Sequence, residues 1–475
     1  MGIPTSDEDI CYLTAATAAA LIRAGEISPV EVVDAVVRRI DDLNPRLNAY
    51  CLVLGEQARA QAQDAEKAVR RGDPLGPLHG VPIAIKDNMM LAGMLHSNGS
   101  RLLRANIAKE DTPAVARVKA AGAIIVGRTN TPEFAWRGST DNRLYGETRN
   151  PWDLGRTPGG SSGGAGAAVA AGLAPLALGS DGAGSIRIPS SFCGIFGLKP
   201  SFGRVPFYPS PGPAELNASL GPMTRTVGDA ALLLDVIAGP DERDRFSLAA
   251  DRGSFAAALD GTVQGLRIAW SPDLGHIPVE PGVAKIAMDG AQTFADLGCV
   301  VEAPDLGLPD PAPILQTLYA ANQAGSHGRR PPSELAEMDP GLVALIEEGR
   351  RLTAVDLGQM AIARAAYWNA MCRVLERYDL LMTPTISVAP FELGIVGPRT
   401  VAGKPVIHLG WTLCYPFNLT GQPAATVPCG FTNDGLPVGL QIVGRRFADA
   451  MVLRAAAAFE GARPWIHHRP PVKSE

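Results

Sequence analysis

An excess of basic residues and long apolar runs are both missing from this sequence. Its 475 residues include 43 Lys and Arg against 48 Asp and Glu, a formal net charge of −5. That balance offers no basic footprint for nucleic acid or for an anionic membrane. No segment reaches the roughly 18 apolar residues of a membrane span. We therefore expect no nucleic-acid or membrane partner, and a small-molecule or peptide-like partner instead.

Cysteine is scarce and irregularly placed. The 7 cysteines are odd in number, and no two of them form a C-x-x-C motif. This pattern predicts neither a disulfide framework nor a zinc site. The first residues also lack the basic region and following apolar stretch of a secretory signal. We expect a cytoplasmic protein that binds no metal.

Short apolar runs alternate with amphipathic segments along the chain, in which 46% of residues are hydrophobic and 19% are charged. The runs 81–85 and 123–127 predict buried strands, and 112–122 between them predicts a helix. Ser28 and Glu31 form the capping box of an earlier helix. Strands alternating with helices predict an α/β fold whose mixed or parallel sheet is covered on both faces.

A glycine-rich stretch, RTPGGSSGGAGAAVAAGLAPLALGSDGAGS, interrupts this alternation. It lacks the lysine of a phosphate-binding loop and gives only the first half of a dinucleotide fingerprint. Gly159 to Gly163 does match G-x-S-x-G, the nucleophile elbow of α/β-hydrolases, with Ser161 as the nucleophile. The elbow requires a strand directly before it and a later acid and histidine. Because Pro158 precedes the motif, this hypothesis is kept only as an alternative.

The other interpretation pairs Ser185 with Lys86. A serine hydroxyl needs a base to take its proton, and lysine is a base only where burial leaves its amine neutral. Lys86 ends the apolar run VPIAI, which supplies that burial. A second hydroxyl from Ser161 or Ser162 is available to relay the proton between them.

Small residues precede Ser185 directly. Gly182, Ala183 and Gly184 leave their backbone N–H groups unobstructed. Two such donors aimed at a developing oxyanion stabilise it by about 3 to 4 kcal/mol each. The pattern is therefore typical of an oxyanion hole next to a nucleophile.

The stretch GGSSGGAGAAVAAGLAPLALGSDGAGSIRIPSSFCGIFGLKPS closely resembles the signature sequence of the amidase signature family. Further blocks resemble the family in the same order, from about residue 10 to 465: HGVPIAIKDN, GRTNTPEF, TRNPWDLGRTPGGSSGG, GPMTRTVGDAALLLDVIAGPD, DLLMTPT and PFNLTGQPAATVPCG. The resemblance implies a mixed central β-sheet sandwiched between layers of α-helices. It implies a single domain over 1–475, with a signature core at about 60–240 and 378–460 and a variable substrate-pocket segment at about 305–350.

The resemblance also implies a Ser–cis-Ser–Lys triad. Ser185 is then the nucleophile, Ser161 the bridging serine after a cis peptide bond, and Lys86 the base. The oxyanion amides would come from Gly182, Ala183, Gly184 and Ser185 itself, with Asp181, Ser162 and Arg187 as structural support. Many members have glycine where this chain has Ala183, so the oxyanion loop is expected to differ slightly in shape because alanine rarely adopts a positive φ.

The resemblance implies an enzyme that hydrolyses the C–N bond of a carboxamide, either an aryl or an alkyl amide. Carbamates and esters are further substrates that it implies. We expect a stand-alone amidase without a cofactor, using a small-molecule amide and water as a monomer or homodimer. The alternative is the amidase subunit of a tRNA-dependent amidotransferase, which releases ammonia from glutamine. Trp136, Arg137 and the 202–217 loop, with Arg204 and Tyr208, are candidates for lining the substrate pocket.

Overall fold

One large sheet organises the chain. The computed structural model describes residues 4, 6–210, 212, 216–251 and 253–472. Within these residues, 11 strands form a sheet in the order β1-β3-β2-β6-β8-β7-β14-β15-β11-β9-β10. The strands of this sheet are β1 Tyr50–Val53, β2 Pro82–Lys86, β3 Ile124–Thr129, β6 Leu176–Asp181, β7 Phe196–Lys199, β8 Ser219–Thr224, β9 Arg267–Trp270, β10 Val300–Glu302, β11 Leu380–Pro384, β14 Ala424–Phe431 and β15 Pro437–Gly444. Two small hairpins lie outside it: β4 Asp141–Asn142 with β5 Gly146–Glu147, and β12 Thr400–Val401 with β13 Lys404–Pro405.

The sheet is mixed, and its parallel part positions the candidate site. β2 pairs in parallel with both β3 and β6, whereas β6 and β8 are antiparallel. Because β2, β3 and β6 run the same way, their carboxyl ends meet at one edge of the sheet. Lys86 is the last residue of β2 and Asp181 the last of β6. The predicted catalytic lysine and the start of the oxyanion loop therefore lie beside each other.

Helices cover both faces of the sheet, as alternating strand residues show. In β2, Ile83 and Ile85 join one core cluster, while Ala84 joins another on the opposite face. The helices are α1 Asp7–Cys11, α2 Ala15–Ala24, α3 Pro29–Leu47, α4 Gly55–Arg71, α5 Pro113–Ala120, α6 Gly163–Ala170, α7 Arg187–Cys193, α8 Val227–Ile237, α9 Pro281–Asp296, α10 Ala312–His327, α11 Pro332–Glu337, α12 Pro340–Arg350, α13 Ala354–Arg377, α14 Pro416–Thr420 and α15 Asp449–Ala462. α5, α8, α9 and α15 contribute to the first cluster, α3 and α6 to the second, and α10 and α13 to a third.

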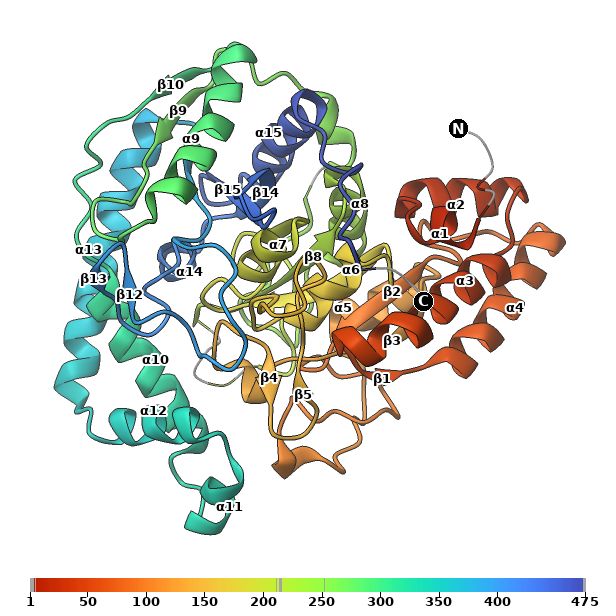
Figure 1. Cartoon of the computed structure of the whole chain (residues 1–475), viewed down its shortest axis with the longest axis horizontal. Helices are drawn as coiled ribbons and strands as arrows, with labels where there is room; N and C mark the ends of the chain where they lie inside the picture. Colours follow the sequence, from red (N-terminus) through yellow and green to blue (C-terminus); the bar gives the residue numbers. More distant parts are fainter. Residues whose placement is uncertain (1–3, 5, 211, 213–215, 252, 473–475) are drawn as a thin grey trace.

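The predicted α/β fold with a mixed, helix-covered sheet is confirmed. A local prediction holds too, because Ser28 and Glu31 form a capping box on α3. β14 and β15 form a hairpin that turns at Gly435, which has a φ of 77°. Figure 1 shows α1–α4 gathered at one end of the molecule and α10–α13 at the opposite end. In the part of the chain that is described, none of the helices combines the length and the apolar character needed to cross a membrane.

A buried carboxylate ties the segment after β7 to α15. Asp449 is 0% exposed and accepts hydrogen bonds from the Ser201 backbone N–H and hydroxyl, both at 2.7 Å. It also lies 3.4 Å from Arg204, whose second partner, Asp251, is partly exposed. This contact holds the beginning of the 202–217 loop against the sheet.

We predict that Asp449→Ala lowers the free energy of unfolding by about 3 to 5 kcal/mol, because it leaves buried donors and part of a guanidinium charge uncompensated. Asp251→Ala removes the exposed partner of the same arginine and is expected to cost less than about 1 kcal/mol. Urea denaturation of the two variants measures the difference. Equal effects would contradict the assignment of Asp449 as the main tie.

Candidate active site

Lys86 is fully buried at the end of β2. Its Nζ lies 2.6 Å from Ser161 Oγ and 3.0 Å from Ser180 Oγ. Burial lowers the pKa of Lys86 well below its usual value, and the nearby charge of Asp181 raises it only in part. An amine in this position therefore loses its proton more easily than the amine of an exposed lysine.

Ser161 is presented by a tightly packed glycine loop before α6. The peptide bond between Gly160 and Ser161 is cis, as the resemblance implied. Thr140 holds the two ends of this loop together. Its hydroxyl donates to the Gly159 carbonyl at 2.8 Å and accepts from the Gly163 N–H at 3.2 Å. A Cβ on Gly160 would come within 2.5 Å of the Ser139 carbonyl oxygen, so the close approach requires glycine.

Ser162 connects the loop of Ser161 to the loop of Ser185. Its backbone N–H donates to the Ser185 carbonyl at 3.1 Å, and its hydroxyl donates to the Ser180 carbonyl at 3.3 Å. Ser161 and Ser185 both line one cavity. Ser185 is partly exposed there, whereas Ser161 is fully buried.

A buried ion pair, Asp181 with Arg187, braces the segment around Ser185. Arg187 Nη2 lies 2.9 Å from Asp181, and both side chains are 0% exposed. The guanidinium also donates to Gln441 Oε1 at 2.7 Å and to Asn418 Oδ1 at 2.6 Å. Burial alone would raise the pKa of Asp181, but Arg187 outweighs it and holds that pKa below its usual value. The carboxylate therefore stays charged.

The backbone amides of the oxyanion loop are not all available. The Gly184 N–H donates to Asp181 Oδ1 at 2.7 Å, so this predicted oxyanion donor is already engaged. The N–H groups of Ala183 and Ser185 have no acceptor among the described residues. The positive φ of this loop falls on Gly184, at 122°, and not on Ala183. Alanine at 183 therefore needs no left-handed backbone, and the expected distortion does not arise from it.

Ser185 opens into a cavity of about 310 Å³. Its walls come from the segment after β2, from η2 (Glu133–Ala135) itself, from the loop after β7 and from α10. The described lining residues are Asn88, Met90, His96, Asn98, Thr112, Phe134, Ala135, Ser161, Ser180, Gly182, Ser185, Phe207, Tyr208, Pro209, Ser210, Asn217, Ala218, Tyr319, Asn322, Gln323, Ser326 and His327. None of these described residues is an aspartate, glutamate, lysine or arginine.

The two histidines of the cavity are neutral near pH 7. Burial and the charge of Arg330 lower the pKa of His327 to about 4. Burial and the charge of Arg128 likewise lower the pKa of His96. Arg330 Nε donates to His327 Nδ1 at 3.2 Å, so the neutral ring carries its proton on Nε2. The described lining of this cavity is therefore polar but uncharged.

Of the predicted pocket residues, Tyr208 lines this cavity, while Trp136, Arg137 and Arg204 are absent from its described lining. Trp136 stacks on His408 and packs against α12. Arg137 pairs with Asp141 and Asp339. These three side chains are therefore not placed to contact a substrate beside Ser185.

Sequence reasoning missed most of the lining. α10 contributes Tyr319, Asn322, Gln323, Ser326 and His327 to the cavity. Their spacing places them on one face of a helix, and this polar stripe is the signal that was available in the variable 305–350 segment.

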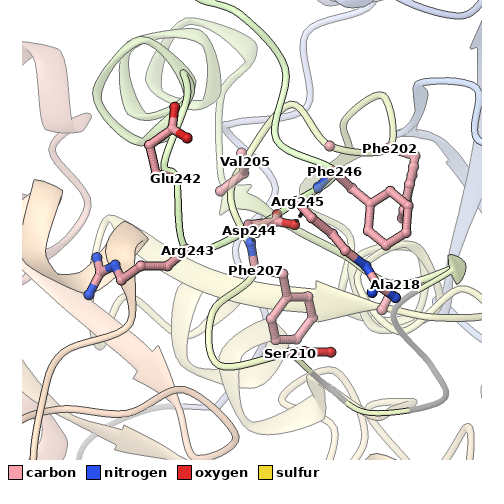
Figure 2. A pocket seen from close by; sticks show the side chains of 11 residues that line it. Phe202, Val205, Phe207, Ser210, Ala218, Glu242, Arg243, Asp244, Arg245 and Phe246 are labelled. Carbon is pink, nitrogen blue, oxygen red and sulfur yellow. Dashed lines mark hydrogen bonds between the residues drawn. The ribbon is translucent and has the colours of Figure 1, made fainter.

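A second cavity, of about 210 Å³, adjoins the first and shares Phe207, Ser210 and Ala218 with it. Figure 2 shows its lining residues, in which Glu242, Arg243, Asp244 and Arg245 stand beside Phe202, Phe207 and Phe246, with Arg243 extending away from the others. Arg243 lies 4.8 Å over the ring of Tyr208, whose hydroxyl donates to Glu110 at 3.1 Å. Positions 211 and 213–215 of the predicted 202–217 loop lie outside the described residues.

The geometry of this region does not fit a metal centre or a nucleophile elbow. Within the described residues, no three His, Cys, Asp or Glu side chains gather as metal ligands would. For the nucleophile elbow, the described residues 151–162 contain no strand, and Ser161 Oγ contacts the Lys86 amine. The strand that an elbow requires is therefore missing.

Asp181→Asn is predicted to lower the free energy of unfolding by about 3 to 5 kcal/mol, because it leaves the buried charge of Arg187 without its counterion. Asp289→Asn breaks an exposed pair with Lys285 at 2.7 Å and is expected to cost less than about 1 kcal/mol. Urea denaturation compares the variants. An Asp181→Asn variant as stable as the control would show that the pair does not brace the loop.

Comparisons with known proteins show the family of this chain. The sequence model of the family described as Amidase matches residues 31–453. The chain is 42% identical to an acylamidase of Rhodococcus erythropolis over 98% of both chains, and 39% identical to a subunit of the glutamyl-tRNA(Gln) amidotransferase of Moorella thermoacetica over 97% of this chain and 99% of the relative. The structure of a bacterial aryl acylamidase of the amidase signature family superposes with a TM-score of 0.92 at 33% identity, covering 96% of this chain and 97% of that one. The chain therefore belongs to the amidase signature family of amide-hydrolysing enzymes.

Proposed function

We propose that the chain is a stand-alone amidase that hydrolyses the C–N bond of an uncharged aryl or alkyl amide through an acyl-enzyme on Ser185. The observation that carries this proposal is the 2.6 Å contact between the buried Lys86 amine and Ser161 Oγ. A neutral amine accepts a proton readily, and a hydroxyl in contact with it can relay one from a neighbouring serine. Carbamates and esters present the same carbonyl chemistry and are further candidate substrates.

Acylation begins when Ser185 Oγ attacks the carbonyl carbon. Ser185 gives its proton to Ser161, and Ser161 gives its own proton to Lys86. As the C–N bond breaks, Lys86 returns a proton through Ser161 to the leaving nitrogen, and the amine departs. Water then attacks the ester on Ser185 and gives a proton through Ser161 to Lys86. As the bond between the acyl carbon and Ser185 Oγ breaks, Lys86 returns that proton through Ser161 to Ser185 Oγ, and the acid product leaves.

The oxyanion of each tetrahedral intermediate needs donors that are not already engaged. We assign this role to the N–H groups of Gly182, Ala183 and Ser185, and not to Gly184, whose N–H already donates to Asp181 at 2.7 Å. Each donor aimed at the oxyanion contributes about 3 to 4 kcal/mol. Asp181, Arg187 and Ser162 hold the loop in the geometry that aims them.

The lining of the cavity supports a neutral substrate. An ammonium or carboxylate moved from water into a cavity without counterions pays a large desolvation penalty. The described lining of the 310 Å³ cavity carries no charged side chain, and both of its histidines have lowered pKa values. The adjoining cavity offers apolar surface from Phe202, Phe207 and Phe246 to an aryl or alkyl group. It is also lined by the charged residues Glu242, Arg243, Asp244 and Arg245.

The second candidate, the glutaminase component of a tRNA-dependent amidotransferase, is favoured by the 39% identity to one such protein. Glutamine, however, carries both an ammonium and a carboxylate next to its amide. No charged group belongs to the described lining of the cavity beside Ser185, so a glutamine whose ammonium and carboxylate stay in that cavity would lack counterions there.

We predict that Ser185→Ala and Lys86→Ala each lower kcat/KM for a neutral anilide by about 10³-fold or more, because each removes one end of the proton relay. Ser387→Ala is the matched control: Ser387 is 0% exposed, and its hydroxyl has no partner in the described chain. Anilide hydrolysis by the purified variants gives the rates. Peptide mapping after reaction with a slowly deacylated ester should find the acyl group on Ser185, whereas the elbow hypothesis places it on Ser161.

For the substrate class, we predict a kcat/KM at least about 100-fold higher for a neutral acyl anilide than for glutamine, which corresponds to about 2.7 kcal/mol. Release of the aniline and of ammonia by the purified chain measures the two reactions. Preferred hydrolysis of glutamine, increasing when an amidotransferase partner is added, would instead establish the glutaminase hypothesis.

A further inference from the structure

Ser180 is a second hydroxyl in contact with the buried amine of Lys86. Its Oγ lies 3.0 Å from Lys86 Nζ, on the strand that runs parallel beside β2. The Asn88 side-chain amide also donates to this oxygen, at 2.8 Å. Ser180 is 6% exposed and belongs to the lining of the catalytic cavity. The triad leaves this contact without a role.

A neutral primary amine has two N–H groups and one lone pair. To accept a proton from Ser161, Lys86 must direct the lone pair at Ser161 Oγ, 2.6 Å away. Rotation about the Cε–Nζ bond would otherwise present an N–H to that oxygen. A second acceptor at a defined angle removes this freedom, because one N–H then points to Ser180.

We propose that Ser180 is a positioning residue of the reaction: its hydroxyl oxygen accepts one Lys86 N–H and so aims the lone pair of the amine at Ser161. The proposal rests on the proposed function, in which Lys86 is the base. Asn88 in turn holds Ser180, since its amide occupies the other acceptor position of the same oxygen.

The same contact serves the protonated state of the relay. After Ser185 has attacked the carbonyl, Lys86 holds an extra proton and is a fully buried ammonium. Ser180 Oγ is already within hydrogen-bond distance, so this cation gains an acceptor without rearrangement. A hydrogen bond from a charged donor is about twice as strong as one from a neutral donor. Ser180 therefore stabilises the ammonium more than the amine.

Ser180→Ala tests the proposal. We expect kcat to fall about 10- to 100-fold through loss of orientation, with KM changed less than about twofold. Because the lost acceptor favoured the ammonium, the pKa of Lys86 should fall further, and the acid limb of the pH profile of kcat/KM should move to lower pH. Ser180→Thr keeps the hydroxyl and should restore most of the rate and the position of the limb. Ser387→Ala again serves as the buried-serine control.

Asn88→Ala provides a second variant should Ser180→Ala fold poorly. It leaves the hydroxyl in place and removes the group that holds it, so we expect a smaller loss of kcat, about three- to tenfold, and a limb shift in the same direction. A kcat within about twofold of the parent in either well-folded variant, or a loss of kcat with an unmoved acid limb, would overturn the proposal. Lys86→Ala and Ser185→Ala, measured alongside, separate a failure of this proposal from a failure of the proposed function. If these two variants are inactive while Ser180→Ala is unaffected, only the role of Ser180 is wrong. If Lys86→Ala and Ser185→Ala are both active, the proposed function is wrong as well.

Discussion

The interaction on which the site depends is the burial of one lysine amine among hydroxyl groups. Water would keep Lys86 protonated, and the apolar end of β2 lowers its pKa by removing that water. Burial has a cost, because an amine without hydrogen-bond partners would destabilise the fold. Ser161 and Ser180 are those partners, at 2.6 Å and 3.0 Å. The two hydroxyls that compensate the burial of Lys86 thus have the two proposed roles. Ser161 relays the proton, and Ser180 orients the amine.

Asp181, at the end of the neighbouring strand β6, must stay charged although it is buried. It is also fully buried, but Arg187 and Asn418 keep its carboxylate ionised. A charge held this way is a rigid point of attachment. The backbone N–H groups of Gly184 in the oxyanion loop and of Ile186 and Arg187 just after it donate to this carboxylate. The guanidinium is bound in turn by Asn418 and Gln441, from the last part of the chain. A local loop therefore takes its shape from contacts more than 200 residues away.

The sequence predicted the parts of this site that depend on local pattern. The apolar run ending at Lys86 indicated burial, and the resemblance of the blocks placed Ser161 and Ser185 in one site. It did not predict that the Gly184 amide turns toward Asp181, because that orientation depends on the contacts of Arg187. The prediction that Trp136 and Arg204 line the pocket was wrong for a related reason. The sequence does not show that such a side chain is buried, yet Trp136 packs against α12 and Arg204 lies beside Asp449.

The lining of the cavity was harder to foresee because most of it is polar and uncharged. α10 faces the hydrophobic core with Ile314, Leu315 and Leu318, and the cavity with its amide, hydroxyl and imidazole groups. Such groups accept or donate hydrogen bonds in many orientations, so no short motif specifies them. Their common property is that none carries charge near neutral pH, which follows for the histidines only once burial and the charges of Arg128 and Arg330 are known. In the proposed function, bond cleavage depends on residues at the strand ends, while α10 contributes five residues to the lining of the cavity in which the substrate would bind.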